Sequence, residues 1–418
     1  MRIAPLALLA AFAAVPVTAN AANGAVIYKY RVTNIRVLDL GTLGGAESIG
    51  LGINNRGDVV GSAQDASTKH NAFMHADGSM VSLHDGSPAF SSASATGIND
   101  SRMVVGAYSR PSDNTQRAFR YYPGIWVETM NSSVAPALPF AWRTVANSIN
   151  ESGQVAGWSQ LIPNPAFPPP PDTAALCFER LPMRWASIVA APATLFCIAD
   201  PDGNETWVDQ GTAPSATDIN NAGDIVGDDA GTSLHSMYVL SGGVRTPVPA
   251  PAGLAELDVW GNPFHSKAAA INDTGWVAGS YGRFSYGSIS PANARAFVWD
   301  GVSASAVNIG TFPSDTRSEA GDLNEQRMVV GTSSGHGSVY GIDDHAFIWH
   351  RDFGMRSLPP LWLGPFFTTV LNDCQAHAMN DRKSSGLVQV TGHCYRSDGR
   401  KHAVRWDVTV VLEALPFP

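Results

Sequence analysis

The sequence predicts an all-β fold, and a repeated motif is the main reason. The stretch Ile53-Asn54-Asn55-Arg56-Gly57-Asp58-Val59-Val60-Gly61 returns in six variants along the chain. Glycine (40 residues) and proline (28) are abundant while charged residues make up only 15%, a composition typical of short strands joined by turns. A repeat with a period of about fifty residues predicts a β-propeller with one blade per copy.

We therefore expect residues 22–418 to form a single domain, a seven-bladed β-propeller with four-stranded antiparallel blades. Each copy starts with an apolar residue and an asparagine: Ile53-Asn54, Ile98-Asn99, Ile149-Asn150, Ile219-Asn220, Ile271-Asn272, Leu323-Asn324 and Met379-Asn380. Eight blades are the alternative, because eight segments compete for the outer-strand positions.

The motif predicts the first hairpin of each blade. The residue four positions before the asparagine is always Gly or Ala, which fits an innermost strand where blades crowd together. Asparagine favours the first position of a type I turn, and glycine tolerates the left-handed conformation three residues later. Arg102 and Arg327 replace this glycine in two copies, so we expect those turns to differ. The glycine that ends the motif predicts a close backbone approach or a bulge.

An aromatic pattern, as in Ala296-Phe297-Val298-Trp299, predicts the third strand. Residues two apart share a strand face, so the Phe and Trp side chains should pack against a neighbouring blade. For the fourth strand of the last blade, Val37–Gly45 and Val408–Leu412 compete. We expect the N-terminal segment to take that place and close the ring, which would leave no long sheet edge open.

The first 21 residues resemble a secretory signal peptide. Arg2 precedes an apolar run from Ile3 to Val17, and Ala19-Asn20-Ala21 is a small-residue cleavage site. We expect export to the periplasm or the extracellular space and no membrane span in the mature chain. A retained anchor is the alternative.

Four cysteines suit an oxidising compartment. We predict the disulfides Cys177–Cys197 and Cys374–Cys394, because each pair lies inside one repeat. Cys374 and Cys394 are also symmetric about the turn of their hairpin, so they could face each other across the two strands. A three-residue turn with a bulge would shift that register by one.

The net charge of −9 without a basic run argues against a nucleic-acid partner, whose phosphates require clustered Lys and Arg.

Three motifs taken together resemble the HAF family of extracellular repeat proteins. They are Leu38-Asp39-Leu40-Gly41-Thr42-Leu43-Gly44-Gly45, the Ile53–Gly61 repeat, and His345-Ala346-Phe347-Ile348-Trp349. The resemblance covers nearly all of the mature chain, and it implies bacterial export and a repeat fold. It supplies no catalytic residue to carry over.

The longest loops should collect on one face of the propeller, where several carry aromatic residues. Loops on a rigid scaffold often hold function, and Tyr and Trp suit recognition of a polymer or protein surface. The candidate binding residues are Trp260, Phe264, Tyr281, Phe284, Tyr286, Tyr340, Trp362 and Phe366. The alternative is that these rings pin their own loops.

Two further motifs bear on chemistry. Gly331-Thr332-Ser333-Ser334-Gly335 matches the hydrolase G-x-S-x-G string, but no helical pattern follows it, so we expect no nucleophile elbow. Asp200, Asp202 and Asn204 offer oxygen ligands in a short loop, as calcium prefers, although a plain polar turn explains them as well. We expect no other cofactor and name no catalytic residue.

We therefore expect a secreted, non-catalytic binding module of the cell envelope or extracellular space, with an unidentified protein or glycan as its ligand. Whether the chain has an activity stays open. A hydrolase or lyase acting on extracellular polysaccharide is one alternative, and a structural surface component is the other.

Overall fold

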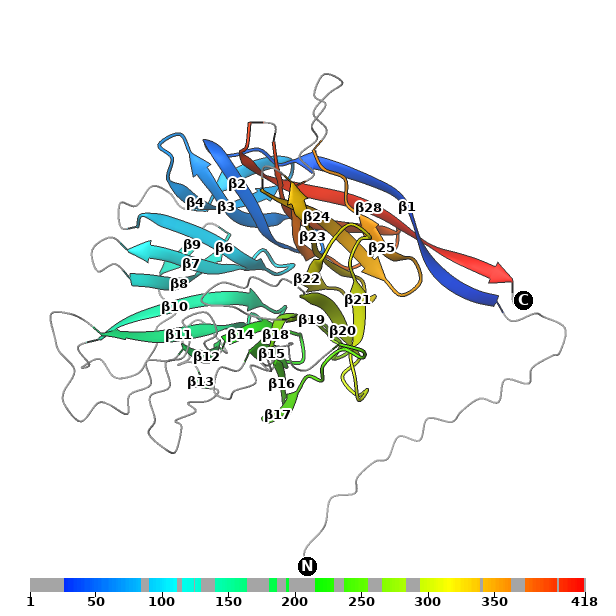
Figure 1. Cartoon of the computed structure of the whole chain (residues 1–418). Coiled ribbons are helices and arrows are strands. Elements are labelled where there is room, and N and C mark those ends of the chain that lie inside the picture. Colours follow the sequence, from blue (N-terminus) through cyan, green and yellow to red (C-terminus); the bar gives the residue numbers. More distant parts are fainter. Residues whose placement is uncertain are drawn as a thin grey trace, which may run out of the picture.

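The computed structural model of the protein describes residues 26–83, 90–110, 115–123, 125–128, 140–163, 180–185, 193–194, 215–228, 237–254, 265–282, 294–338, 341–361, 373–396 and 398–416. The described chain is all-β, as expected from its composition. Its strands form seven separate antiparallel sheets of four strands each (Figure 1).

We number the sheets along the chain. Sheet 1 contains β2 (Gly44–Ile53), β3 (Val59–Asp65), β4 (His70–Ala76) and β5 (Ser79–Ser82). Sheet 2 contains β6 (Ser92–Ile98), β7 (Val104–Arg110), β8 (Thr115–Tyr122) and β9 (Ile125–Glu128). Sheet 3 contains β10 (Phe140–Ile149), β11 (Val155–Pro163), β12 (Arg180–Trp185) and β13 (Ala193–Thr194). Sheet 4 contains β14 (Ser215–Ile219), β15 (Ile225–Asp228), β16 (Met237–Ser241) and β17 (Val244–Pro247). Sheet 5 contains β18 (His265–Ile271), β19 (Val277–Gly282), β20 (Arg295–Trp299) and β21 (Val307–Gly310). Sheet 6 contains β22 (Arg317–Leu323), β23 (Val329–Ser338), β24 (Gly341–His350) and β25 (Gly354–Ser357). Sheet 7 contains β26 (Cys374–Met379), β27 (Leu387–Tyr395), β28 (Lys401–Pro416) and β1 (Val26–Asp39).

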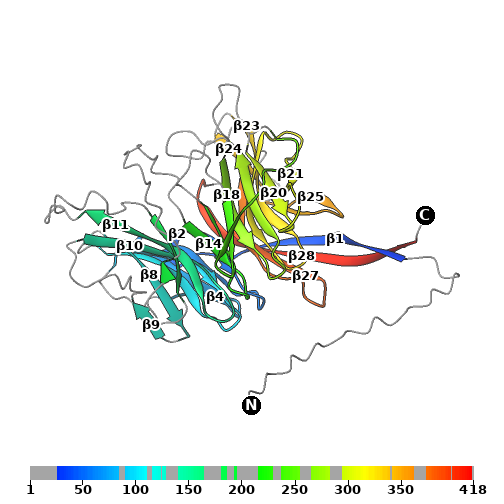
Figure 2. The same cartoon turned by 90° about the horizontal axis from the view of Figure 1, so that it is seen from below.

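Sheet 7 joins the two ends of the chain. Its strand order is β26-β27-β28-β1, so an N-terminal strand is its outer strand, as the sequence predicted. The predicted segment Val37–Gly45 contributes only Val37–Asp39 to this strand, because β1 begins at Val26 and β2 begins at Gly44. Val37 pairs with Trp406 in this register. The competing segment Val408–Leu412 is the continuation of β28, so it is no additional outer strand. Beyond sheet 7, β1 and β28 run on as a two-stranded ribbon that extends away from the other sheets (Figures 1 and 2).

The first hairpin of every sheet has the same two irregularities. The turn shifts the pairing by one residue, so that Ile53 pairs with Val59, and a bulge at Leu51 shifts it back, so that Ser48 pairs with Ala63. The other six first strands carry a bulge at the matching residue. At Gly61, a Cβ atom would lie only 1.9 Å from the carbonyl oxygen of Ile49. The close approach predicted for the last glycine of the motif is therefore confirmed.

The expectation that Arg102 and Arg327 make different turns is wrong. Both residues adopt the left-handed conformation that Gly57 adopts in the first copy, with φ values of 63°, 64° and 89°. Each guanidinium group makes contacts that offset the backbone cost. Arg102 forms a two-pronged ion pair with Asp58 (2.8 and 3.0 Å), and Arg327 lies over the ring of Trp276.

The third strands supply the largest core side chains. Phe73, Phe119, Phe297 and Phe347 of four sheets are fully buried, and so is Trp406 of sheet 7. Phe297 packs with Met237 and Val226 of the preceding sheet. The predicted packing of aromatic residues between neighbouring sheets is therefore confirmed.

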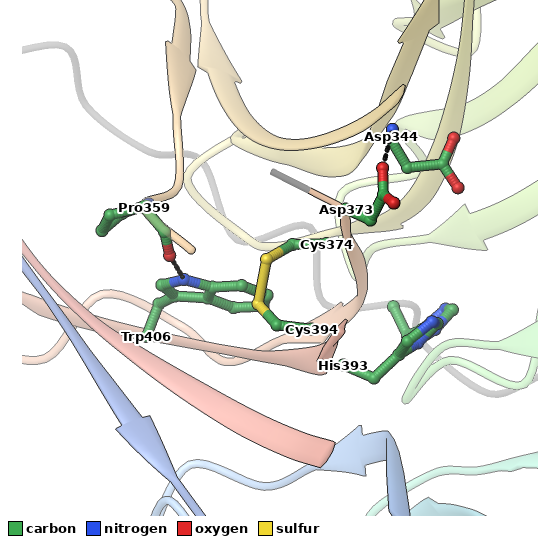
Figure 3. The surroundings of a disulfide bond; sticks show 8 residues. Asp344, Pro359, Asp373, Cys374, His393, Cys394 and Trp406 are labelled. Atoms are coloured by element: carbon green, nitrogen blue, oxygen red, sulfur yellow. Dashed lines mark hydrogen bonds between the residues drawn. A yellow bond between two sulfur atoms is a disulfide. The ribbon is translucent and has the colours of Figure 1, made fainter. Parts of the chain in front are cut away.

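The disulfide Cys374–Cys394 is present. The two residues pair directly across β26 and β27, with their Cα atoms 4.1 Å apart (Figure 3). The bulge at His377 restores the register on which the prediction depended. Cys177 and Cys197 lie outside the described residues.

Candidate functional site

The repeat asparagines form a closed ring of hydrogen bonds. Each donates its side-chain amide N–H to the backbone carbonyl of the repeat asparagine in the next sheet, at 2.9–3.2 Å, and Asn380 donates to Asn54. The side-chain oxygen of the same asparagine accepts a backbone N–H from its own turn, as Asn54 does from Asp58. One residue type therefore shapes the turn and also ties the sheet to its neighbour.

A second ring lies one residue further along each turn. Here each backbone N–H donates to the side chain of the matching residue in the next sheet, at 2.7–3.0 Å, and the last returns to the first. Its members are Asn55, Asp100, Glu151, Asn221, Asp273, Glu325 and Asp381. We call it the acidic ring, because five of the seven are carboxylates.

The two rings lie at one end of a central cavity of about 660 Å³. All seven bulge residues of the first strands line it: Leu51, Thr96, Asn147, Thr217, Ala269, Gly321 and His377. A bulge re-aims a side chain, and here it supplies one residue per sheet to the shared cavity. The cavity reaches from the acidic ring to Ser266 and Lys267, which stand near the start of β18 where a predicted long loop ends.

Two aspartates in the cavity wall hold neighbouring sheets together. Asp218 accepts hydrogen bonds from the Ser148 hydroxyl (2.5 Å) and the Ile271 N–H (2.9 Å). Asp322 accepts the N–H groups of Leu323 and Met379, both at 2.7 Å. Burial raises the pKa of both carboxyls, and the charge of Asp218 helps to bring the pKa of Asp322 to about 8. Both groups therefore favour the protonated form more than an exposed aspartate does.

Other charged groups stand at the two ends of the cavity. Asp228 accepts the Ala268 N–H at 2.6 Å, and burial raises its pKa to about 7. Lys267 lies 4.0 Å from Glu319. At the opposite end, burial raises the pKa of Glu151 and Glu325 within the acidic ring.

Two histidines of sheet 7 pack against each other beside the cavity. Nε2 of His377 lies 3.0 Å from Nδ1 of His393, and the two rings stack (Figure 3 shows His393 beside the disulfide). Burial, with the charges of Lys267 and Lys401 as smaller causes, lowers the pKa of His377 to about 4. Burial also lowers the pKa of His393 to about 3. Both imidazoles are therefore neutral near pH 7.

Most of the predicted binding residues fall outside the described residues: Trp260, Phe264, Phe284, Tyr286, Tyr340, Trp362 and Phe366. Tyr281 is described, and it is buried on β19 in the same core cluster as Phe297. Its ring packs between sheets and is not presented on a loop.

The two other predicted motifs give no site in the described residues. Ser333 and Ser334 lie in the middle of β23, where Ser334 donates to Asp344 at 2.5 Å, and no helix follows. Asp200, Asp202 and Asn204 lie outside the described residues. Among the residues that the structure describes, no group of three possible metal ligands occurs. The described part of the chain also contains no helix of the length and apolarity needed to cross a membrane.

The cavity and its rings were missed at the sequence level, although two signals were available. The residue after each repeat asparagine is always Asn, Asp or Glu, which are the residues of the acidic ring. The bulge position varies widely in size and polarity, from Gly321 and Ala269 to Leu51 and His377, whereas the residues on either side of it are less variable.

Comparison with known proteins leaves the family open. No protein-family model matches the chain, and no curated protein sequence matches it. The resemblance to the HAF family therefore stays a prediction from the motifs.

Several solved structures are similar over most of their length. An oligogalacturonate lyase in complex with manganese is 9% identical, with a TM-score of 0.49 over 92% of this chain and 98% of that one. YCF48 from Cyanidioschyzon merolae is 9% identical, with a TM-score of 0.43 over 88% and 98% of the two chains. A gluconolactonase from Xanthomonas campestris is 12% identical, with a TM-score of 0.36 over 93% and 98%. Because these TM-scores are below 0.5, function has to be argued from the geometry of this chain.

Proposed function

We propose that the chain is an exported, seven-bladed β-propeller that binds an extracellular ligand in its central cavity without transforming it. In this proposal each sheet is one blade, and β1 closes the ring by completing sheet 7. The closed rings of hydrogen bonds support the closure, because the seventh sheet bonds to the first as every other sheet bonds to its successor.

The observation that carries the proposal is the cavity lined by one bulge residue from each of the seven sheets. Its volume of about 660 Å³ lies within the range of roughly 300–1,000 Å³ that small-ligand sites occupy. The carboxylates in its wall are engaged by backbone N–H groups, as Asp218 and Asp322 are, so they act as structural acceptors. Such groups suit a binding site better than a site for proton transfer.

A filled cavity tests this function. Ala269→Phe would place an aromatic ring in the cavity, and Val244→Phe would add one on the outer strand β17, where Val244 is 67% exposed. On a glycan array with the mature chain, we expect Ala269→Phe to abolish binding and Val244→Phe to leave it unchanged. Binding that survives Ala269→Phe, while the thermal unfolding of the variant is normal, would place the ligand elsewhere.

A second candidate is a hydrolase or lyase that acts on extracellular polysaccharide. It is favoured by the approach of Asp218 and Asp322, two carboxyls with raised pKa that line one cavity. Paired carboxyls in different protonation states can serve as acid and base. If the chain is an enzyme, Asp322→Asn should lower the release of reducing ends from a polysaccharide by about a hundredfold or more.

A further inference from the structure

We propose that the central cavity selects an uncharged, polyhydroxylated ligand, such as the end of a neutral glycan, and that His377 is its specificity-determining residue. The inference rests on the proposed binding function and assigns the ligand class and the contact residue.

His377 stands out among the bulge residues that line the cavity. It is the one imidazole among them, and its Nε2 is already engaged by His393. Its Nδ1 has no hydrogen-bond partner within the described residues. His377 can therefore offer its Nδ1 atom to a ligand for a hydrogen bond, while the contact of Nε2 with His393 holds its ring in place.

The partner histidine fixes what His377 can offer. In the Nε2–Nδ1 contact one nitrogen must carry the proton and the other must accept it. If His393 donates, Nδ1 of His377 carries a proton towards the ligand; if His393 accepts, that Nδ1 is an acceptor. Since a hydroxyl group both donates and accepts, it can match either tautomer, and a carboxylate or an ammonium group can match only one.

His393 supplies a second, independent sign that the pair has a further role. It is 3% exposed, and its Nε2 has no partner within the described residues. Leaving a buried polar atom unpaired costs about 1–3 kcal/mol, so a purely structural histidine at this place would be disfavoured.

The charges around the cavity disfavour an anion along its wall and a cation beside His377. An anion would meet the carboxylates of the acidic ring, which ends the cavity. A cation beside His377 would face Lys267, whose charge already contributes to the low pKa of that histidine. An uncharged ligand avoids both penalties, and its hydroxyls can also reach Thr217, a bulge residue in the wall of sheet 4.

Three sets of tetrasaccharides of equal length test the proposal: neutral hexose or N-acetylhexosamine oligomers, uronate oligomers, and glucosamine oligomers. Binding is measured by calorimetry at pH 7 on the mature chain. We expect a neutral oligomer to bind at least tenfold more tightly than the other two classes. His377→Ala should weaken it by about tenfold, the value of one hydrogen bond.

His377→Asn is the matched variant, because Asn147 occupies the same bulge position in sheet 3 and an amide also donates and accepts. It should recover part of the affinity lost in His377→Ala, and unchanged thermal unfolding would show that both variants fold. Stronger binding of uronate or glucosamine oligomers would contradict this inference and leave the proposed function standing. The same holds if His377→Ala binds neutral oligomers as tightly as the wild type does. If no oligomer binds, or if Ala269→Phe leaves binding intact, the proposed function fails with it.

Discussion

Single residues in this chain carry out two tasks at once. Each repeat asparagine closes a turn with its side-chain oxygen and reaches the next sheet with its amide group. In four sheets a Ser or Thr on the first strand also joins its sheet to the preceding one. Ser48, Thr144, Ser266 and Ser318 each accept a backbone N–H from the third strand of the preceding sheet, at 2.7–2.9 Å. The joints between sheets are therefore made from polar residues as well as from apolar packing.

Arg102 allows the cost of a left-handed residue to be separated from the value of its ion pair. Arg102→Gly loses the contacts to Asp58 but suits the positive φ, whereas Arg102→Ala loses the same contacts and keeps the strain. We expect Arg102→Ala to be less stable than Arg102→Gly by about 1–2 kcal/mol in urea unfolding. Equal stabilities would mean that the turn relaxes in the variants.

The buried carboxyls predict that stability is lost as pH rises from about 4 to about 8. The pKa of Asp322 is raised to about 8 in the folded chain, so the native state binds more protons than the unfolded state between about pH 4 and pH 8. Stability should therefore fall as pH rises through this window. The His377–His393 pair has the opposite sign, but its effect is complete by about pH 6.5, the ordinary histidine pKa.

Asp322→Asn should accordingly reduce the stability difference between pH 6.5 and pH 8 by roughly 1–2 kcal/mol, as measured by urea unfolding at the two pH values. The variant also loses one acceptor for the Leu323 or Met379 N–H, so its absolute stability should be lower at both pH values. The slope that remains should come in part from Asp228. An unchanged difference in Asp322→Asn would mean that this carboxyl is ionised at pH 6.5.

At the scale of the element, the bulged hairpin decides what the repeat can do. A regular hairpin would alternate its side chains between the two faces of the sheet, and no residue would be diverted. The bulge turns one residue per sheet towards the cavity and brings the two strands so close that only glycine fits at Gly61 and its equivalents. The last glycine of the motif predicted a close approach or a bulge, but not that the bulge lies on the first strand at Leu51.

The disulfide takes the place of a hydrogen-bonded joint in sheet 7. Cys374 occupies the position of Ser48 in sheet 1, and Cys394 that of Ala63. Cys374→Ala with Cys394→Ala should cost about 3 kcal/mol, since the bridge spans 20 residues. Cys374→Ser with Cys394→Ala rebuilds the pair found in sheet 1.

We expect this serine variant to recover about 1 kcal/mol in urea unfolding, the value of one added hydrogen bond. If both double variants are equally stable, the serine makes no contact with the preceding sheet. The wild-type chain under the same oxidising conditions serves as the reference for both double variants.

At the scale of the whole molecule, the two ends of the chain meet in one sheet. Tyr30, Val32, Ile35 and Val37 of β1 pack against the core cluster that includes Trp406. The same strand covers the edge of β28, which would otherwise be open. The last sheet therefore depends on a strand from the other end of the sequence.

Removal of residues 22–39 should lower the free energy of unfolding by about 4–6 kcal/mol, because four partly buried apolar side chains leave the core. The exposed edge should also promote aggregation, measurable by light scattering. A chain of residues 30–413, which loses only the end of the ribbon, is the control and should change stability by less than about 1 kcal/mol. Equal losses in the two truncations would show that β1 contributes little to sheet 7.

The sequence by itself determined the repeated module: its turn residues, its crowded first strand, its aromatic third strand, the disulfide in sheet 7 and the N-terminal outer strand. All but the last are local or symmetric within one repeat, so residue preferences and spacing are enough to predict them. The outer strand was predictable because its residues match the fourth-strand pattern of the other repeats and because an open sheet edge is unfavourable. The cavity, both hydrogen-bond rings and the pairing of His377 with His393 were decided only by the tertiary structure. The cavity and the rings arise where residues of different repeats meet. The contact of His377 with His393 depends on the bulge in β26, because the direction of a side chain at a bulge depends on the register of the strand beside it.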